Sequence, residues 1–231
     1  MQIQGLRSGY GGKPVLQGID LEVGKGEIVA VIGRNGVGKS TLMRALMGLL
    51  PATAGQILID DKDVTQVSPH KRARMGIGYI PQGRDVFPRM TVAENLAVGE
   101  TLLKPGTSPD YDRIYQYFPV LKERASQRAG TLSGGQQQQL AIARVLVGRP
   151  NIILLDEPSE GIQPNIVQDI ARNVRDLNRE LGLTVLFVEQ NLDMIMLLAQ
   201  HCFVIDKGQI VARLSAEDLN DPDAVRRYLA L

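Results

Sequence analysis

The chain of 231 residues is 44% hydrophobic, which is enough for a substantial core in one large domain or two small ones. Its net charge of +1, with no block of like charges, gives no electrostatic reason to expect a nucleic-acid partner. No apolar run is long enough to span a bilayer, so we expect the chain to reach any membrane at which it works through another subunit.

The cysteine content and the N-terminus both indicate a reducing, cytosolic setting. The single cysteine, Cys202, cannot form a disulfide within the chain, and its apolar neighbours predict a packed thiol. The first ten residues, MQIQGLRSGY, lack the basic start and the apolar centre of a secretion signal.

The first part of the chain alternates apolar runs with glycine-rich turns. Strands are predicted at about residues 2–7, 15–23, 27–32, 56–60 and 77–80. A helix is predicted from Lys39 to Gly48, directly after a loop rich in glycine. This part of the sequence therefore contains several strands and one early helix.

Between about residues 85 and 150 the pattern becomes helical. Thr91 is expected to cap a helix that runs through Ala97, and the segment TSPDYDRIYQYF is expected to open a second. The segment GGQQQQLAIARVLVG predicts a long third helix. We interpret this region as a helical insertion within an α/β domain.

After residue 150 strands and helices alternate again. The strands NIILLD and TVLFV are followed by helices at about 165–181 and 192–199, and CFVIDKGQIVAR predicts a hairpin. Such alternation implies a mostly parallel sheet with both faces covered. No linker divides the chain, so a single domain over residues 1–231 is predicted, ending in two short helices capped by Ser215 and Asp221.

The segment GRNGVGKST, residues 33–41, predicts a site for phosphate. It follows the apolar run IVAVI and precedes a helix, which is the context that a phosphate-binding loop requires. Gly33, Gly36 and Gly38 allow the backbone to turn its N–H groups inward, and the helix adds its positive dipole end. Lys39 supplies a charge for the β- and γ-phosphates, and the Ser40 hydroxyl can ligate Mg²⁺.

A pair of acids at a second strand end can supply a carboxylate for the metal and a general base, which this loop lacks. In IILLDEP, residues 152–158, an apolar run leads directly into Asp156 and Glu157. An unpaired carboxylate at a buried strand end is costly, so Mg²⁺ is the expected partner of Asp156. Glu157 can then polarise a water molecule against the γ-phosphate as a general base. Two acids on a solvated turn are the alternative interpretation.

The segment LSGGQ, residues 132–136, places Ser133 and two glycines at the start of a helix. Free backbone N–H groups at a helix N-terminus suit a phosphate, although this pattern is also a common helix cap. Because the chain already holds one complete phosphate loop, a second phosphate site is best used on a nucleotide held by another subunit. A nucleotide would then join two such domains.

Together, GRNGVGKST, YIPQGR, LSGGQ and IILLDEP, in this order and spacing over about residues 1–210, resemble the ATP-binding subunit of ABC transporters. The resemblance implies an α/β fold, the P-loop NTPase fold of the ABC ATPase type. That fold has a mostly parallel sheet, an N-terminal antiparallel β-subdomain and the helical insertion. The resemblance also implies an ATPase that binds ATP and Mg²⁺.

The resemblance also assigns roles to single residues. The expected catalytic residues are Glu157, Gln190 and Lys39, and the expected metal ligands are Ser40, Gln82 and Asp156. Tyr10 is expected to stack on adenine, and Ser133, Gly135 and Gln136 to contact the ATP of the opposite subunit. The expected nucleotide-binding residues are Tyr10, Gly33, Asn35, Gly36, Gly38, Lys39, Ser40, Thr41, Gln82, Ser133, Gly135 and Gln136.

The sequence departs from the family pattern at three glutamines. Gln163 stands where an aspartate is common, Gln139 where an arginine is frequent, and Gln190 where a histidine is usual. A neutral amide cannot take up a proton near pH 7, but it can donate to a phosphate oxygen and orient a water molecule. We therefore expect Gln190 to sense the γ-phosphate and Glu157 to be the base, while Glu189 and Asn191 receive no role.

The loop GRDVFPRMTVAEN places Phe87, Pro88 and Met90 among polar residues. These apolar side chains either tuck into the helical insertion or form a groove for a short helix of a membrane permease, which the resemblance favours.

The runs PQGRDVFPRMTVAENL and LDEPSEGIQP, together with Gln190, are similar to the subgroup that serves branched-chain amino acid uptake, and SEGIQP is most similar to the urea-uptake branch. The expected partners are a second ABC ATPase subunit, either a paralogue or an identical copy in a homodimer, permease subunits and, indirectly, a solute-binding protein. The expected location is peripheral, on the cytoplasmic side of the inner membrane. A soluble ABC ATPase outside transport and a weakly hydrolysing regulatory subunit are the alternatives.

Overall fold

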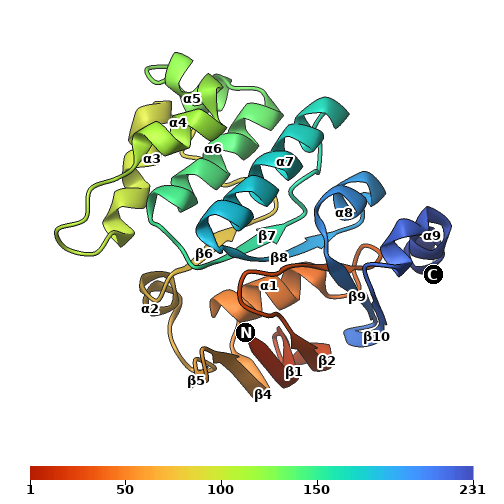
Figure 1. The fold of residues 1–231 in the computed structure, drawn as a ribbon. Coiled ribbons are helices and arrows are strands. Elements are labelled where there is room, and N and C mark those ends of the chain that lie inside the picture. Colours follow the sequence, from red (N-terminus) through yellow and green to blue (C-terminus); the bar gives the residue numbers. More distant parts are fainter. Residues whose placement is uncertain (231) are drawn as a thin grey trace.

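The computed structural model describes residues 1–230, so the final residue of the predicted C-terminal tail lies outside the described part. Two β-sheets and a set of helices make up the fold (Figure 1). Among the described residues, no helix combines the length and the hydropathy that crossing a membrane requires.

The larger sheet has six strands and carries the site. Its strands, in spatial order, are β10 (Gln209–Leu214), β9 (His201–Asp206), β3 (Ile28–Ile32), β8 (Thr184–Glu189), β7 (Ile152–Asp156) and β6 (Ile77–Ile80). All neighbouring pairs are parallel except the hairpin of β9 and β10. The predicted, mostly parallel sheet is therefore confirmed, and the carboxyl ends of β3, β7 and β8 lie at one edge.

The smaller sheet is antiparallel and comes mainly from the N-terminal part of the chain. Its strands, in spatial order, are β2 (Lys13–Glu22), β1 (Gln2–Tyr10), β4 (Ala52–Ile59) and β5 (Lys62–Asp63). The predicted N-terminal antiparallel subdomain is confirmed. The predicted strands at 15–23 and 56–60 correspond to β2 and β4, and β5 was not predicted.

Nine α-helices belong to the described residues: α1 (Lys39–Met47), α2 (Pro69–Arg74), α3 (Val92–Gly99), α4 (Tyr111–Tyr117), α5 (Pro119–Glu123), α6 (Gly134–Val147), α7 (Pro164–Leu181), α8 (Leu192–Leu198) and α9 (Pro222–Ala230). Three short 3₁₀ turns in the same described part lie at Glu100–Leu102, Ala129–Thr131 and Asp218–Asn220. Helices α3 to α6 lie between β6 and β7 in the chain, as the predicted insertion requires, and they gather at one end of the molecule (Figure 1).

The central strand β3 is apolar at every position because both of its faces are buried. Ile28, Ala30 and Ile32 pack on the face that α6, α7 and α8 cover. Val29 and Val31 point to the opposite face, where α1 and the smaller sheet cover them. A strand buried on both faces shows a continuous apolar run instead of alternation. Buried polar groups directly after such a strand need hydrogen-bond partners.

Helix α2 was not predicted, and its buried arginine supports the helix after the phosphate loop. The Arg72 side chain is 1% exposed and donates to the carbonyls of Val67, Thr65, Ala45 and Leu46. The last two carbonyls lie near the end of α1, where a cation also complements the negative end of the helix dipole. Arg72 thereby stabilises the C-terminal end of α1.

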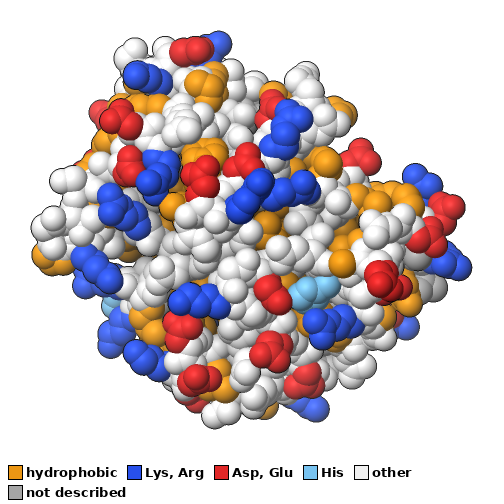
Figure 2. Space-filling model, in the orientation of Figure 1, with side chains coloured by type: hydrophobic (Ala, Val, Ile, Leu, Met, Phe, Trp, Pro, Cys, Tyr) orange, Lys and Arg blue, Asp and Glu red, His pale blue; other side chains and the backbone are white. Residues whose placement is uncertain are grey.

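Charged side chains of both signs are interspersed over the face drawn in Figure 2. The charge distribution of this face therefore resembles that of an ordinary solvated surface.

Candidate nucleotide site

The predicted phosphate loop connects β3 to α1. Gly36 and Gly38 have φ of 82° and 116°, a backbone region that other residues adopt at a cost, and Gly38 immediately precedes the helix. No side chain caps this N-terminus, so its N–H groups are free for an anion. A Cβ on Gly33 would lie 2.4 Å from the Ile205 carbonyl oxygen, which explains the need for glycine at the start of the loop.

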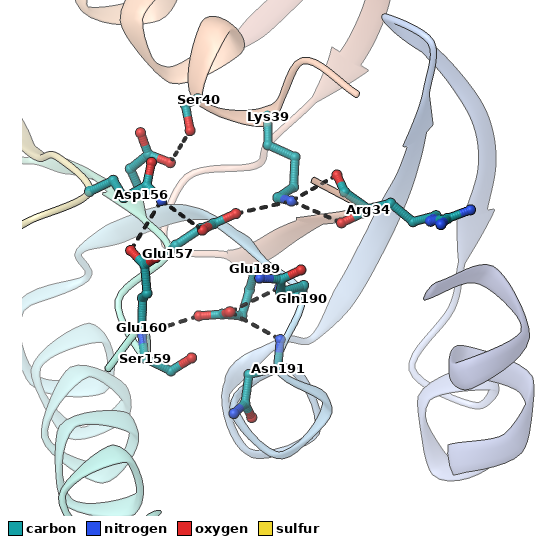
Figure 3. A network of polar contacts seen from close by, with 12 residues as sticks. Arg34, Lys39, Ser40, Asp156, Glu157, Ser159, Glu160, Glu189, Gln190 and Asn191 are labelled. Atoms are coloured by element: carbon teal, nitrogen blue, oxygen red, sulfur yellow. Dashed lines mark hydrogen bonds and ion pairs between the residues drawn. The ribbon is translucent and has the colours of Figure 1, made fainter. Parts of the chain in front are cut away.

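Lys39 is held by three oxygen atoms (Figure 3). Its side chain is 3% exposed, and Nζ donates to the carbonyls of Gly33 at 2.9 Å and Arg34 at 3.0 Å. Nζ also lies 3.0 Å from Oε1 of Glu157. A buried ammonium is tolerated here because both carbonyl dipoles and a carboxylate compensate its charge.

Asp156, at the end of β7, is joined to the phosphate loop. The Ser40 hydroxyl donates to its Oδ1 at 2.9 Å, and the Tyr79 hydroxyl donates to its Oδ2 at 3.3 Å. Burial raises the pKa of the Asp156 carboxyl, because desolvation outweighs these hydrogen bonds. The described residues contain no cluster of three or more metal-ligating side chains, whereas a hydroxyl beside a carboxylate is an oxygen donor set that fits Mg²⁺ held largely by phosphates.

Glu157 adopts a backbone conformation that is uncommon for its residue type. Its φ is 48°, and its N–H donates to the Val188 carbonyl of β8 at 3.0 Å. A strained residue persists only where its surroundings hold it, and such residues concentrate at functional sites. Gln82 Nε2 donates to Oε2 of Glu157 at 3.2 Å and to the Glu160 carboxylate at 3.0 Å, so Gln82 links the loop after β6 to the acidic pair.

These groups line one open cavity of about 370 Å³. It is lined by Val15, Asn35, Gly36, Gly38, Lys39, Ser40, Thr41, Gln82 and Glu157. The structure thus brings together most of the phosphate-binding residues that the sequence predicted. It also adds Val15 of β2, which the sequence analysis did not single out.

The predicted second phosphate site lies at the start of α6 and outside this cavity. The Ser133 hydroxyl accepts from the Gln136 N–H at 3.3 Å, and Gln136 Oε1 accepts from the Ser133 N–H at 3.0 Å. These two hydrogen bonds form a reciprocal capping box, so the motif caps the N-terminus of α6. Neither residue lines the cavity around Lys39, and Gly135 does not line it either.

Arg84 connects this helix to the acidic loop. Its guanidinium donates to the Glu160 carbonyl at 2.8 Å, and it fills the space beside Gly134, where a Cβ would lie 3.0 Å from Nη1. Arg84 therefore contacts both the start of α6 and the loop that follows Glu157.

Comparisons with known proteins identify the family of the chain. Residues 16–160 match the family model described as ABC transporter. The chain belongs to the ABC transporter family. Within it, the chain is 43% identical over 95% of both chains to the high-affinity branched-chain amino acid transport ATP-binding protein BraG of Pseudomonas aeruginosa. It is 35% identical to the lipopolysaccharide export system ATP-binding protein LptB of Escherichia coli, over 97% of this chain and 94% of that protein.

The fold matches solved structures of the same family. A crystal structure of a nucleotide-free ATP-binding cassette from an ABC transporter aligns with a TM-score of 0.83 and 31% identity, over 99% of this chain and 98% of that one. The expected ABC type of the P-loop NTPase fold is confirmed, and the chain is an ABC ATPase.

The aromatic residue expected to stack on adenine lies at the edge of the site. Tyr10 ends β1 and is 43% exposed, and its hydroxyl accepts a long hydrogen bond of 3.4 Å from Arg44. It does not line the cavity, whereas Val15 of the adjacent strand does. Stacking of Tyr10 on adenine stays a prediction.

The three residues that follow β8 have different environments. Gln190 is exposed and does not line the cavity, so its role as a γ-phosphate sensor stays a prediction. Asn191 caps α8 by accepting from the Met194 N–H at 3.1 Å. Glu189 is 1% exposed, and burial raises the pKa of its carboxyl despite hydrogen bonds from backbone N–H groups.

Sequence reasoning assigned no function to Glu189 and did not consider Tyr79 or Arg84. For Glu189 a signal was present, because TVLFVE shows the same apolar run into an acid as IILLD. Besides Gln190, two glutamines depart from the family pattern. Gln163 precedes α7 without capping it, and Gln139 lines a separate cavity between α5, α6 and α7.

Proposed function

We propose that this ABC ATPase powers a membrane importer of branched-chain or other hydrophobic amino acids. The similarity to BraG along 95% of both chains carries the proposal, since the identity to LptB is lower at 35%. The SEGIQP run supports urea as the alternative solute. An ATP-binding subunit need not touch the transported solute, so transport itself has to decide between the two.

The arrangement of the cavity supports a mechanism for ATP hydrolysis. Lys39 and the free N–H groups of α1 hold the β- and γ-phosphates. The exposed ring of Tyr10, at the edge of the site, stacks on adenine. Ser40, Gln82 and Asp156 would hold Mg²⁺, which would supply positive charge to the phosphate oxygens. Glu157 accepts the proton of the attacking water, and Gln190 donates to a γ-phosphate oxygen.

The position of the second phosphate site supports a dimer. Because Ser133, Gly135 and Gln136 do not line the cavity of their own chain, they are available to the ATP of a second ABC ATPase subunit, a paralogue or an identical copy. Nucleotide then closes the dimer, and hydrolysis reopens it. The dimer works as a peripheral assembly on the cytoplasmic side of the plasma membrane, beneath permease subunits that a solute-binding protein supplies.

Two observations bear on the alternative of a weakly hydrolysing regulatory subunit. The glutamines at 163 and 190 favour it. The intact cluster of Lys39, Asp156 and Glu157 favours a hydrolysing subunit. Release of inorganic phosphate by the purified assembly distinguishes the two, because a regulatory subunit would contribute little to it.

Transport by the native assembly tests the proposal. The tagged chain is purified from membranes of its own organism with the subunits that accompany it, and the complex is reconstituted in vesicles. Uptake of labelled leucine and labelled urea is then measured with ATP. Leucine uptake that Glu157→Gln abolishes supports the proposal. Urea uptake alone, export, or recovery of the chain without membrane subunits overturns it.

A further inference from the structure

A buried carboxylate joins the two loops that flank the expected γ-phosphate position. Glu189 ends β8 in the centre of the larger sheet and is 1% exposed. Its Oε1 accepts from the N–H groups of Gln190 at 2.9 Å and Asn191 at 3.0 Å. Its Oε2 accepts from the N–H of Ser159 at 3.2 Å, across the gap between neighbouring strands (Figure 3).

These hydrogen bonds connect the loop of the base to the loop of the expected sensor. Ser159 lies two residues after Glu157, and Gln190 directly follows Glu189. The N–H of Glu157 also donates to the Val188 carbonyl at 3.0 Å. The two loops are therefore tied by a backbone hydrogen bond on one side and by the Glu189 side chain on the other.

The chemistry of the contacts explains why a carboxylate is used. All three contacts are N–H donors, and among the described residues no ion pair involves Glu189. Only a carboxylate offers two oxygens that both accept, so it can hold both loops at once. An amide would turn an NH₂ group toward one of the N–H groups and release that loop.

Burial makes a charge at this position costly. Neighbouring β8 residues are fully buried and apolar, and burying a carboxylate among them is unfavourable unless it makes good hydrogen bonds. A charge retained at such a cost is expected where the relative position of two loops matters.

We propose that Glu189 is a positioning residue for ATP hydrolysis, which fixes the distance between the Glu157 carboxylate and the Gln190 amide. The inference rests on the proposed roles of those two residues. Glu189 itself is buried and does not line the cavity around Lys39. It determines the positions of the Glu157 and Gln190 side chains relative to the γ-phosphate.

The test is steady-state ATP hydrolysis by the purified assembly carrying Glu189→Gln. The kcat is expected to fall about 10–100-fold, because a small misplacement of a catalytic group has effects of this size. The KM for ATP is expected to change less than about threefold, since Lys39 and the phosphate loop are untouched. Glu189→Asp, which keeps both acceptor oxygens on a shorter side chain, is expected to retain more activity than Glu189→Gln.

A double-mutant cycle separates positioning from loss of stability. If Glu189 acts through Gln190, the loss of kcat in Glu189→Gln combined with Gln190→Ala is smaller than the product of the two single losses. Asn178→Ala is the matched control, because Asn178 is also buried and donates to the carbonyls of Gly26 and Leu183, away from the site. It is expected to lower the Tm without lowering kcat.

The outcomes distinguish the inference from the function on which it rests. Unchanged kcat in Glu189→Gln, an equal kcat loss in Asn178→Ala, or strictly multiplicative effects in the cycle overturns the role of Glu189. If Glu157→Gln hydrolyses ATP as fast as the unmodified chain, the assignment of the base fails instead. If Glu189→Gln does not fold, Glu189→Asp carries the same kcat and KM comparison.

Discussion

The residue expected to hold the phosphates also pairs with the expected base. Lys39 pairs with Glu157 at 3.0 Å and with two backbone carbonyls. A γ-phosphate near Nζ offers several charged oxygens and replaces the carboxylate as the partner of the ammonium. If the two residues have the expected roles, bound ATP should therefore compete with Glu157 for Lys39.

Substitution of the two expected catalytic side chains gives different results. Glu157→Gln removes the base but leaves the phosphate loop intact, so ATP turnover falls by about 10²-fold or more and an ATP-bound dimer accumulates. Gln190→Ala removes only one hydrogen-bond donor and slows hydrolysis by about tenfold. Phosphate release and size-exclusion chromatography with ATP measure both effects.

The matched comparison for these variants is Lys39→Ala, which removes the phosphate contact itself. It should lose ATP binding as well as turnover, and no ATP-dependent dimer should form. Rapid turnover by Glu157→Gln, or a larger loss in Gln190→Ala than in Glu157→Gln, would contradict the assigned roles.

The loop between β6 and α3 presents an aromatic side chain that the fold does not bury. Phe87 is 44% exposed and lies beneath the Arg144 guanidinium, 5.1 Å from the ring centroid. Buried Asn95 of α3 holds the loop by accepting from the Phe87 N–H and donating to carbonyls on either side. The Phe87 ring thus contacts the insertion through Arg144 of α6 and leaves part of its surface exposed, so both interpretations of this loop stay predictions.

Phe87→Ala tests whether this ring anchors the permease. An exposed aromatic on a rigid loop is a typical interface hot spot, so the amount of permease that copurifies with the tagged chain is expected to fall about tenfold or more. Hydrolysis by the isolated chain should not change. Val211→Ala is the control, since Val211 is 55% exposed on β10 and should not affect copurification. Equal copurification in both variants would remove the docking role.

The hairpin of β9 and β10 positions one wall of the nucleotide cavity. Gly208 in its turn has φ of 77°, and a Cβ there would lie 1.8 Å from the Val15 carbonyl oxygen of β2. The Gly208 carbonyl accepts from the Gln17 N–H at 2.8 Å. The turn therefore joins the larger sheet to the smaller sheet at Val15, which lines the cavity.

Gly208→Ala is expected to lower the free energy of unfolding by about 2–4 kcal/mol, because it combines backbone strain with overpacking. The Tm should fall by roughly 5–15 °C in calorimetry. ATP affinity should fall as well, since β2 has to move. Gly12→Ala is the control: its φ is 80°, but nothing lies within 4 Å of an added Cβ, so only the strain remains. Equal losses in both variants would exclude close packing as the cause.

The sequence predicts those parts of the site in which a residue type at a given position has one common physical explanation. A phosphate loop needs glycine and lysine between a strand and a helix, and acids directly after a buried strand need a partner. The cavity lined by Lys39 and Glu157 was therefore predictable. The role of Arg72 and the contacts of Glu189 were not, because each depends on segments distant in the chain. Pairing of Lys39 with Glu157 was missed because the two residues are distant in the chain.

Folding of the whole domain determines the reactivity of its single thiol. Cys202 lies in β9 with 0% exposure, within the core cluster that extends from the helical insertion to α9. Burial raises the pKa of this thiol to about 12. An aromatic disulfide reagent should therefore not react with the native chain at pH 8, and it should react with one thiol per chain in denaturant.

The same thiol should report nucleotide binding. Reaction in mild denaturant requires opening of the core, and a ligand that binds only the folded state lowers the population of open molecules. ATP at about 100 times its Kd should slow labelling about 100-fold, equivalent to about 2.7 kcal/mol. In Lys39→Ala, ATP should have no such effect, because the phosphate contact is lost. Rapid labelling of the native chain at pH 8, or slowing by ATP in Lys39→Ala, would show that Cys202 reports something other than global opening coupled to this cavity.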